Sequence, residues 1–244
     1  MSGRRTTAAP LHPEAGLVRR LVVVILAVVL LCGAGVWWFV LRDDAPPPAA
    51  LGDCASPAAS DAPDTPDGRW SLEPDPEREA VFVGYRIEER FGGETVTKTA
   101  TGRTSDVEGS LVVTDGEVTE ASIVAHLDSL RSDRTARDSA MRRRGLETDT
   151  FPEARFTLTA PIVLASAPTV GSATDAVATG TLELHGEQAE VDVPIEACWT
   201  GPTIKLSGSA PVVLADYGIE QVQTPIVDIA DHGELEFELV FTPA

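Results

Sequence analysis

The sequence has few cysteines, few aromatic residues and few cations, and each shortage argues against a class of protein. Its 244 residues include only 3 cysteines, too few for a scaffold held by several disulfides. Lys and Arg number 19 against 38 Asp and Glu, and the net charge of -19 disfavours binding to nucleic acid. Only 5% of residues are aromatic although 43% are hydrophobic, so aliphatic and β-branched side chains dominate and favour strands. The length predicts one domain with appended segments.

The sequence patterns of common enzymes are also missing. There is no G-x-S-x-G elbow, no G-x-x-x-x-G-K-[ST] loop, no G-x-G-x-x-G fingerprint and no H-E-x-x-H motif. The histidines are His12, His126, His185 and His232, and no metal-binding set can be assembled from them. We therefore predict no catalytic residue, no metal site and no enzyme activity.

Residues 21–41 form a run without charge, LVVVILAVVLLCGAGVWWFVL. A helix of this length spans the hydrocarbon core of a bilayer, which is about 30 Å thick. Two arginines precede the run and two aspartates follow it, which predicts that residues 1–20 are a cytoplasmic tail and that the rest lies outside. A cleaved signal peptide is the alternative, because VLLC ends at Cys32. A small residue is needed where Leu31 stands, so we expect an uncleaved, single-pass transmembrane helix.

Residues 42–69 are dense in Pro, Ala, Asp and Ser and offer almost no side chain to bury. This composition predicts a disordered tether that leads to a domain at 70–244. Cys54 lies in the tether and Cys198 in the domain. In an oxidising compartment the two could form a disulfide that ties the tether to the domain; the alternative is that Cys198 is an ordinary buried thiol.

Short alternating runs separated by turn residues fill the domain. In GELEFELVF the apolar residues share one face, and Glu234, Glu236 and Glu238 share the other, which we expect to be the wet exterior. An Asp-Gly pair at 115–116 predicts a hairpin. No β-helix-β rhythm appears, so we predict an all-β domain of about eight antiparallel strands. The pattern leaves a closed barrel and a two-sheet sandwich open.

One segment interrupts the strands, RSDRTARDSAMRRRGLETDTFP at 131–152. It gathers six arginines within fourteen positions and is predicted to hold the one short helix of the domain. Two explanations stay open. The arginines could offset neighbouring carboxylates on a solvated helix face, or they could bind an anion at the mouth of a barrel.

Five motifs in this chain resemble those of the YceI-like family of lipid-binding proteins. They are S-L-x-S at 129–132, an Arg-Asp pair at 137–138, F-P-x-x-x-F at 151–156, G-x-L-x-x-x-G at 180–186 and D-Y-G-I at 216–219. Each motif is weak alone, but all five stand in the family's order over about 70–241. The resemblance implies a lipocalin-like antiparallel barrel with a long apolar cavity, which in the family holds isoprenoid chains.

Candidate site residues follow from the resemblance and from the predicted strands. The aromatic side chains expected to line the cavity and bind the ligand are Phe82, Tyr85, Phe156 and Trp199. If the lipid ends in a phosphate, the arginines expected to bind this headgroup at the barrel entrance are Arg137, Arg142, Arg143 and Arg144.

Together these observations predict a non-catalytic carrier of an apolar lipid, with a polyisoprenoid as the expected ligand and no other cofactor. The domain would lie outside the cytoplasmic membrane, held there by its transmembrane helix, and would sequester the lipid or hand it over. One alternative is an extracytoplasmic interaction module with a packed barrel that binds an envelope protein. A second is a small-molecule enzyme that uses the same cavity.

Overall fold

The computed structural model describes residues 14–36, 45–54, 65–74, 81–91, 96–164 and 168–244. The chain divides into two compact units, Met1–Asp44 and Ala45–Ala244. In the first unit, helix α1 runs over Glu14–Val36. Within the described residues, none of the helices combines the length and the apolar character needed to cross a membrane. The structure therefore does not support the transmembrane helix predicted at 21–41, the last residues of which lie outside the described part.

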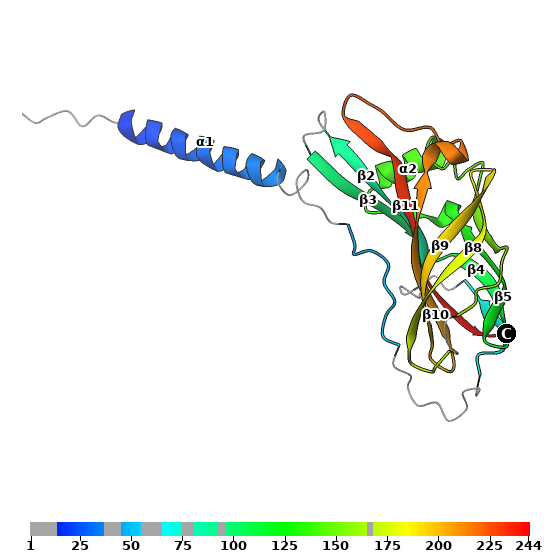
Figure 1. The fold of residues 1–244 in the computed structure, drawn as a ribbon. Coiled ribbons are helices and arrows are strands. Elements are labelled where there is room, and N and C mark those ends of the chain that lie inside the picture. Colours follow the sequence, from blue (N-terminus) through cyan, green and yellow to red (C-terminus); the bar gives the residue numbers. More distant parts are fainter. Residues whose placement is uncertain (1–13, 37–44, 55–64, 75–80, 92–95, 165–167) are drawn as a thin grey trace, which may run out of the picture. The chain divides into compact units, whose positions relative to one another are not determined.

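The second unit is built on one antiparallel sheet of 11 strands (Figure 1). In chain order the strands are β1 (Gly68–Leu72), β2 (Phe82–Phe91), β3 (Val96–Thr104), β4 (Val107–Thr114), β5 (Glu117–His126), β6 (Arg131–Ser132), β7 (Glu153–Leu158), β8 (Ala173–Leu184), β9 (Glu187–Trp199), β10 (Ile204–Val213) and β11 (Val227–Pro243). The helix α2 (Thr135–Arg143) and the 3-10 helices η2 (Leu127–Ser129) and η3 (Leu214–Tyr217) interrupt them.

Eight of the strands close into a ring. They pair in the order β1-β4-β5-β7-β8-β9-β10-β11, and β11 returns to β1 with Trp70 opposite Pro243. The 17 residues of β11 are long enough to pair with β1 near one end and with β2 along the other part, from which β3 and β6 extend the sheet. The prediction of an all-β antiparallel barrel is confirmed, and the ring excludes the sandwich.

Two hairpins depend on residues with positive φ. Asp115 and Gly116 have φ of 52° and 79° between β4 and β5, and His185 and Gly186 have φ of 53° and 81° between β8 and β9. Positive φ at both central positions is typical of the type I′ turn, whose twist matches that of the flanking strands. The hairpin predicted at 115–116 is confirmed.

Residues 45–54, which we call the strap, belong to the segment 42–69 that the sequence predicts to be a disordered tether. The strap lies along the outer face of the barrel, where three backbone carbonyls accept hydrogen bonds from cationic side chains. Arg86 Nη2 donates to the carbonyl of Pro46 over 2.7 Å, and Arg103 Nη2 to that of Pro47 over 2.9 Å. Lys205 Nζ donates to the carbonyl of Asp53 over 2.7 Å. Polar backbone contacts, and not buried side chains, hold the strap. Residues 42–44 and 55–64 lie outside the described part, and the tether stays a prediction.

The strap covers a charge cluster around Glu236 on β11. The Glu236 side chain is 1% exposed, and its carboxylate accepts from Arg86 Nε at 3.3 Å and from Arg103 Nη2 at 2.9 Å. The backbone N–H of Ala49 in the strap donates to the same carboxylate over 3.2 Å. The prediction that Glu236 belongs to the wet exterior is therefore wrong, because two guanidinium groups and an amide replace water around it.

Candidate functional site

The barrel interior contains a hollow that its side chains do not fill. A cavity of about 220 Å³ lies between the strands and is lined almost entirely by apolar side chains. Representative lining residues from six strands are Leu111, Ile123, Phe156, Leu182, Val193 and Phe237. Protein interiors leave few voids larger than a water molecule, so a cavity of this size is better suited to a ligand than explained as a packing defect.

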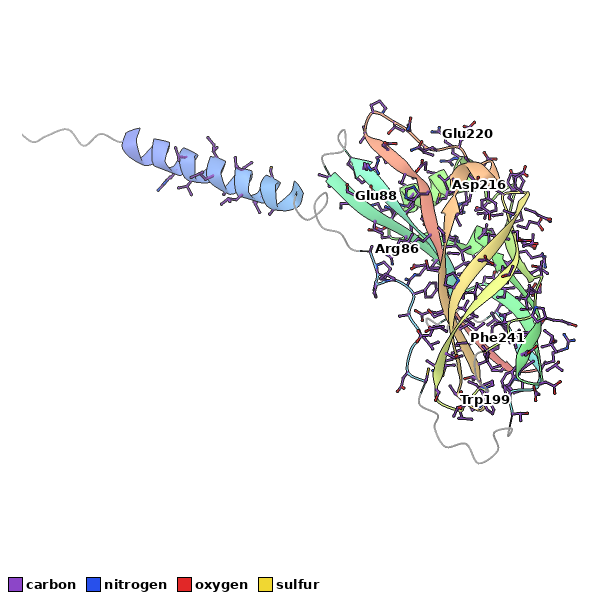
Figure 2. All side chains as sticks on the ribbon, viewed as in Figure 1. Arg86, Glu88, Trp199, Asp216, Glu220 and Phe241 are labelled. Carbon is purple, nitrogen blue, oxygen red and sulfur yellow. The ribbon has the colours of Figure 1, made fainter. Side chains whose placement is uncertain are left out.

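A second cavity lies next to the first and is bordered by α2. It has a volume of about 80 Å³ and shares Val83, Ala154 and Leu235 with the larger cavity. Met141 in α2 and Leu146 just after it also line this second cavity. Figure 2 shows side chains throughout the barrel, with Trp199 toward one end and Asp216 toward the other. The two cavities are neighbours and both have a mainly apolar lining.

The period of two along each strand explains why the lining is apolar. On β11 the residues Leu235, Phe237 and Leu239 all line the larger cavity, as the alternation in the sequence indicated. The glutamates between them point to the outer face, where Glu236 meets the strap. On β11 one face therefore supplies the hollow and the other carries the glutamates.

The predicted aromatic residues separate into three places. Phe156 and Trp199 line the larger cavity, and Tyr85 lines the smaller one. Phe82 is 3% exposed and lies on the outer face under Arg103, whose Cζ is 3.9 Å from the centre of the phenyl ring. Its neighbour Val83 takes the inward position of that pair and lines both cavities. Ligand contact by the four aromatic residues stays a prediction.

Two glycines make room for two of these rings. A Cβ on Gly180 would overlap the ring of Phe156, and a Cβ on Gly102 would overlap the ring of Tyr85. Gly102 lies directly opposite Tyr85 on β3. The rings can therefore lie flat against neighbouring backbone, which leaves space in the hollow that a larger residue would close.

Arg137, one of the predicted headgroup arginines, is held by two carboxylates, and its contact with a headgroup stays a prediction. Its Nε and Nη2 donate to the two oxygens of Glu89 over 2.8 and 2.9 Å, and its Nη1 donates to Asp133. Burial lowers the pKa of Arg137, but the hydrogen bonds that it donates to Glu89 and Asp133, and the negative charges of these groups, outweigh this effect and raise the pKa above its usual value, so the side chain stays charged. Arg137 thereby fastens α2 to β2.

The next residue, Asp138, fastens the same helix to β6. Asp138 is 8% exposed and accepts hydrogen bonds from the backbone N–H of Ser132 at 2.9 Å and from its hydroxyl at 2.6 Å. The Arg-Asp pair noted in the sequence thus positions the helix that borders the smaller cavity.

Three of the predicted headgroup arginines lie at the end of α2. Arg143 and Arg144 are exposed and Arg142 is half-buried, directly after Met141, which lines the smaller cavity. Their positions beside the hollow suit a headgroup site, and this role stays a prediction.

The hydroxyl of Tyr85 is a polar group that sequence reasoning did not single out. Its Oη is buried and has no hydrogen-bond partner among the described residues. Burial raises the pKa of Tyr85 well above its usual value; the Arg137 guanidinium lowers it, and the carboxylates of Glu89, Asp138 and Asp133 raise it. The phenol therefore stays protonated and able to donate.

The strap brings Cys54 close to Cys198. Both are free thiols, and Cys198 Sγ lies 3.8 Å from the backbone carbonyl oxygen of Cys54. Burial, with a further contribution from Cys54, raises the pKa of the Cys198 thiol to about 12. The arrangement suits the predicted disulfide, which stays a prediction.

Comparison with solved structures supports the barrel. A polyisoprenoid binding domain from Saccharophagus degradans, implicated in plant cell wall breakdown, is 22% identical with a TM-score of 0.55, over 72% of this chain and 98% of that one. BcnA from Burkholderia cenocepacia is 18% identical with a TM-score of 0.50, over 64% of this chain and 95% of that one. At these identities the likeness shows the fold alone.

Comparison of the sequence itself gives the family. A search of curated proteins found no match. Residues 73–241 match the family described as the YceI-like domain. This match includes the strands of the ring from β4 to β11. Because this match includes more than half of the chain and agrees with the eight-stranded ring, the protein belongs to the YceI-like domain family.

Proposed function

We propose that the domain binds an apolar lipid, a polyisoprenoid, in the barrel hollow and carries it without making or breaking bonds. The apolar cavity of about 220 Å³ inside the barrel, with the smaller apolar cavity next to it, is the observation that carries this proposal. The family supports it, and so does the fold shared with a protein described as a polyisoprenoid binding domain. The hollow interior favours a carrier over an interaction module with a packed barrel.

The chemistry of the lining favours a hydrocarbon ligand. Each buried CH₂ group contributes about 0.8 kcal/mol, so a chain of several isoprene units would gain most of its binding free energy from burial alone. A ligand with many polar groups would lose its hydrogen bonds to water and find few replacements among the lining side chains.

A pair of neighbouring positions on β8 tests the cavity directly. Ala178 lines the larger cavity, whereas Val177 beside it is 54% exposed. Ala178→Phe should weaken binding of a prenol in detergent at least tenfold by filling the hollow, and Val177→Phe should bind it like the wild type. Titration calorimetry measures both. Equal affinity in the two variants and the wild type would contradict binding inside the barrel.

The proposed location of the domain is outside the cytoplasmic membrane. This part rests on the sequence alone, on the charge-free run 21–41 with arginines before it and aspartates after it. The full chain should stay with membranes after alkaline carbonate washing, and a chain that begins at Ala45, the first residue of the second compact unit, should be released. Release of both would remove the anchor from the proposal.

A further inference from the structure

The connection between β7 and β8 closes the barrel wall where β7 stops short. β7 ends at Leu158, which pairs with Gly180, whereas β8 begins several residues before that position, at Ala173. The structure describes two parts of this connection, 159–164 and 168–172, which we call together the rim loop. The rim loop takes the place that a longer β7 would occupy.

Backbone hydrogen bonds hold both parts of the rim loop on neighbouring strands. On one side, Ile162 and Val118 of β5 exchange two N–H to C=O bonds, of 2.9 and 3.2 Å. On the other side, the N–H of Gly171 donates to the carbonyl of Trp199 in β9 over 2.8 Å. The loop therefore belongs to the rim of the barrel at the end where Figure 2 labels Trp199 and Phe241.

The larger cavity reaches the surface beside the rim loop. Ile162, Leu164 and Pro168 line this cavity from the loop. Thr169 and Ser172 also line it, and both residues are exposed. A ligand that enters or leaves the cavity at this opening therefore passes along the loop.

The rim loop exposes apolar side chains and carries no charge. Val163 is 67% exposed and Val170 is 43% exposed, and they are two of the five large hydrophobic residues exposed in the described part of the second unit. The sequence from 156 to 174, FTLTAPIVLASAPTVGSAT, has no charged residue, in a chain whose net charge is -19. An uncharged opening with exposed apolar side chains is suited to contact with an apolar partner.

The cavity beside the loop indicates what this partner is. A hydrocarbon ligand that left the barrel into water would expose every CH₂ group that the barrel had buried, which is unfavourable. The surface that faces the opening must therefore accept hydrocarbon itself. A lipid bilayer does so, whereas a protein partner would need a second apolar cavity aligned with the first.

The charges at this end of the barrel indicate the class of lipid. The charged side chains within two positions of the strand ends there are four carboxylates and two cations, namely Asp67, Asp115, Glu117 and Asp175 against Arg69 and Lys205. Lys205 is also bonded to the strap. This excess of negative charge would repel anionic lipids, so a zwitterionic bilayer is favoured.

We propose that the rim loop docks on the surface of a zwitterionic bilayer, with Val163 and Val170 in contact with its lipids, and that the apolar ligand passes between bilayer and cavity at this opening. The inference rests on the proposed function and adds the surface through which the ligand is exchanged.

The first test measures how fast the full chain takes up a ligand. The variant Val163→Asp/Val170→Asp places a charge at both exposed apolar positions of the loop. The matched control, Val177→Asp/Val213→Asp, changes two valines that are 54% and 44% exposed and line neither cavity. Ligand-free protein is mixed with phosphatidylcholine vesicles that contain a fluorescent prenol, and energy transfer from Trp199, which lines the larger cavity, follows the loading. The loop variant should load at least about fivefold more slowly than the wild type and the control, because a charged side chain opposes contact with the bilayer.

Affinity for the same prenol in detergent separates this inference from the proposed function. Wild type, loop variant and control should bind the prenol equally tightly there, because the changed side chains do not line the cavity. Failure of the wild type to bind would remove the proposed function and this inference with it. A loop variant that loses affinity in detergent as much as it loses loading rate would overturn the docking role alone.

A second test detects the contact itself without adding a charge. In Val163→Trp, vesicles of brominated phosphatidylcholine should quench the fluorescence of the added indole, relative to the wild type, and in Val177→Trp they should not. Equal quenching of the two added indoles would contradict docking through the loop. This test also decides the question if the charged loop variant fails to fold.

The class of lipid has its own test. Replacing half of the phosphatidylcholine with phosphatidylglycerol should slow loading of the wild type at low ionic strength, and added salt should restore the rate. Faster loading from the anionic vesicles would overturn the preference for a zwitterionic surface.

Other outcomes would assign the loop or the exchange elsewhere. Equal loading rates in the loop variant and the control would overturn the inference. Loading that is slowed by replacing Arg142, Arg143 and Arg144 with Gln, but not in the loop variant, would place the exchange at α2. A dimer of the wild type in detergent that the loop variant cannot form would assign the loop to a second copy of the chain.

Discussion

At the scale of single residues, the carboxylate of Glu236 carries the most consequence for stability. It is 1% exposed and interacts with Arg86, Arg103 and the strap. Glu236→Ala would leave two guanidinium groups without their anion, which typically costs about 3–5 kcal/mol of unfolding free energy. Urea denaturation measures this loss.

The control for Glu236 is its exposed neighbour on the same strand face. Glu234→Ala should change the unfolding free energy by no more than about 0.5 kcal/mol, since the side chain is exposed. If both variants lost equally little, the strap would not shield the cluster in solution.

The thiol of Cys198 makes the free energy of unfolding depend on pH in the alkaline range. Its pKa is raised from 9.0 to about 12 when the protein folds, because burial disfavours the thiolate. The folded protein therefore retains a proton that the unfolded chain releases, and the free energy of unfolding falls as the pH rises from 9 toward 12. Under reducing conditions Cys198→Ala should flatten this decline, whereas Cys32→Ala, in the other unit, should not. Parallel declines in wild type and Cys198→Ala would contradict the assignment.

Single-residue positions were only partly predictable from the sequence. Alternation placed Leu235, Phe237 and Leu239 on one face correctly, because the period of two is a local property of a strand. It could not place Phe82, since both Phe82 and Val83 are apolar and buried, and only the three-dimensional closure decides which one faces the hollow.

At the scale of elements, the arginines in and just after α2 differ in their contacts and in their expected roles. Arg137 is held by Glu89 and Asp133, so Arg137→Gln should lower stability by about 1–3 kcal/mol, and we expect the loss to appear whether or not lipid is present. Replacing Arg142, Arg143 and Arg144 with Gln should cost little stability. It should weaken the binding of a phosphorylated prenyl chain and leave the binding of an uncharged one unchanged. Melting curves and titrations of both variants give the comparison. Equal losses of affinity for the two ligands would contradict the headgroup prediction.

The strap offers a second element-scale prediction, that Cys54 and Cys198 form a disulfide under oxidising conditions. Oxidised glutathione would accept the two electrons and two protons that the thiols lose. Intact mass should then fall by two hydrogen atoms, and peptide mapping should join the segments around the two cysteines. A chain that keeps both thiols after prolonged oxidation, while it remains folded, would refute the pairing.

The two elements differ in how far the sequence predicts them. The helix was predictable from the local sequence, and α2 runs over Thr135–Arg143. The contacts of the strap were not, because its carbonyls are held by Arg86, Arg103 and Lys205, which stand on distant strands.

At the scale of the whole molecule, closure of the eight-stranded ring encloses the apolar faces of strands whose apolar and polar residues alternate. The strands and the hairpin at 115–116 could be read from the sequence, but ring closure depends on the pairing of Trp70 with Pro243, which lie at opposite ends of the domain. No local pattern predicts such a contact. The volume of the hollow also escaped prediction, because it depends on ring positions set by glycines on neighbouring strands.

The most direct test of the carrier proposal is to extract the purified protein with organic solvent and identify the released molecules by mass spectrometry. We expect a long-chain apolar lipid in amounts comparable to the protein, and its loss from Ala178→Phe but not from Val177→Phe. Repeated extraction that yields no lipid from the wild type, or equal amounts from the two variants, would contradict it.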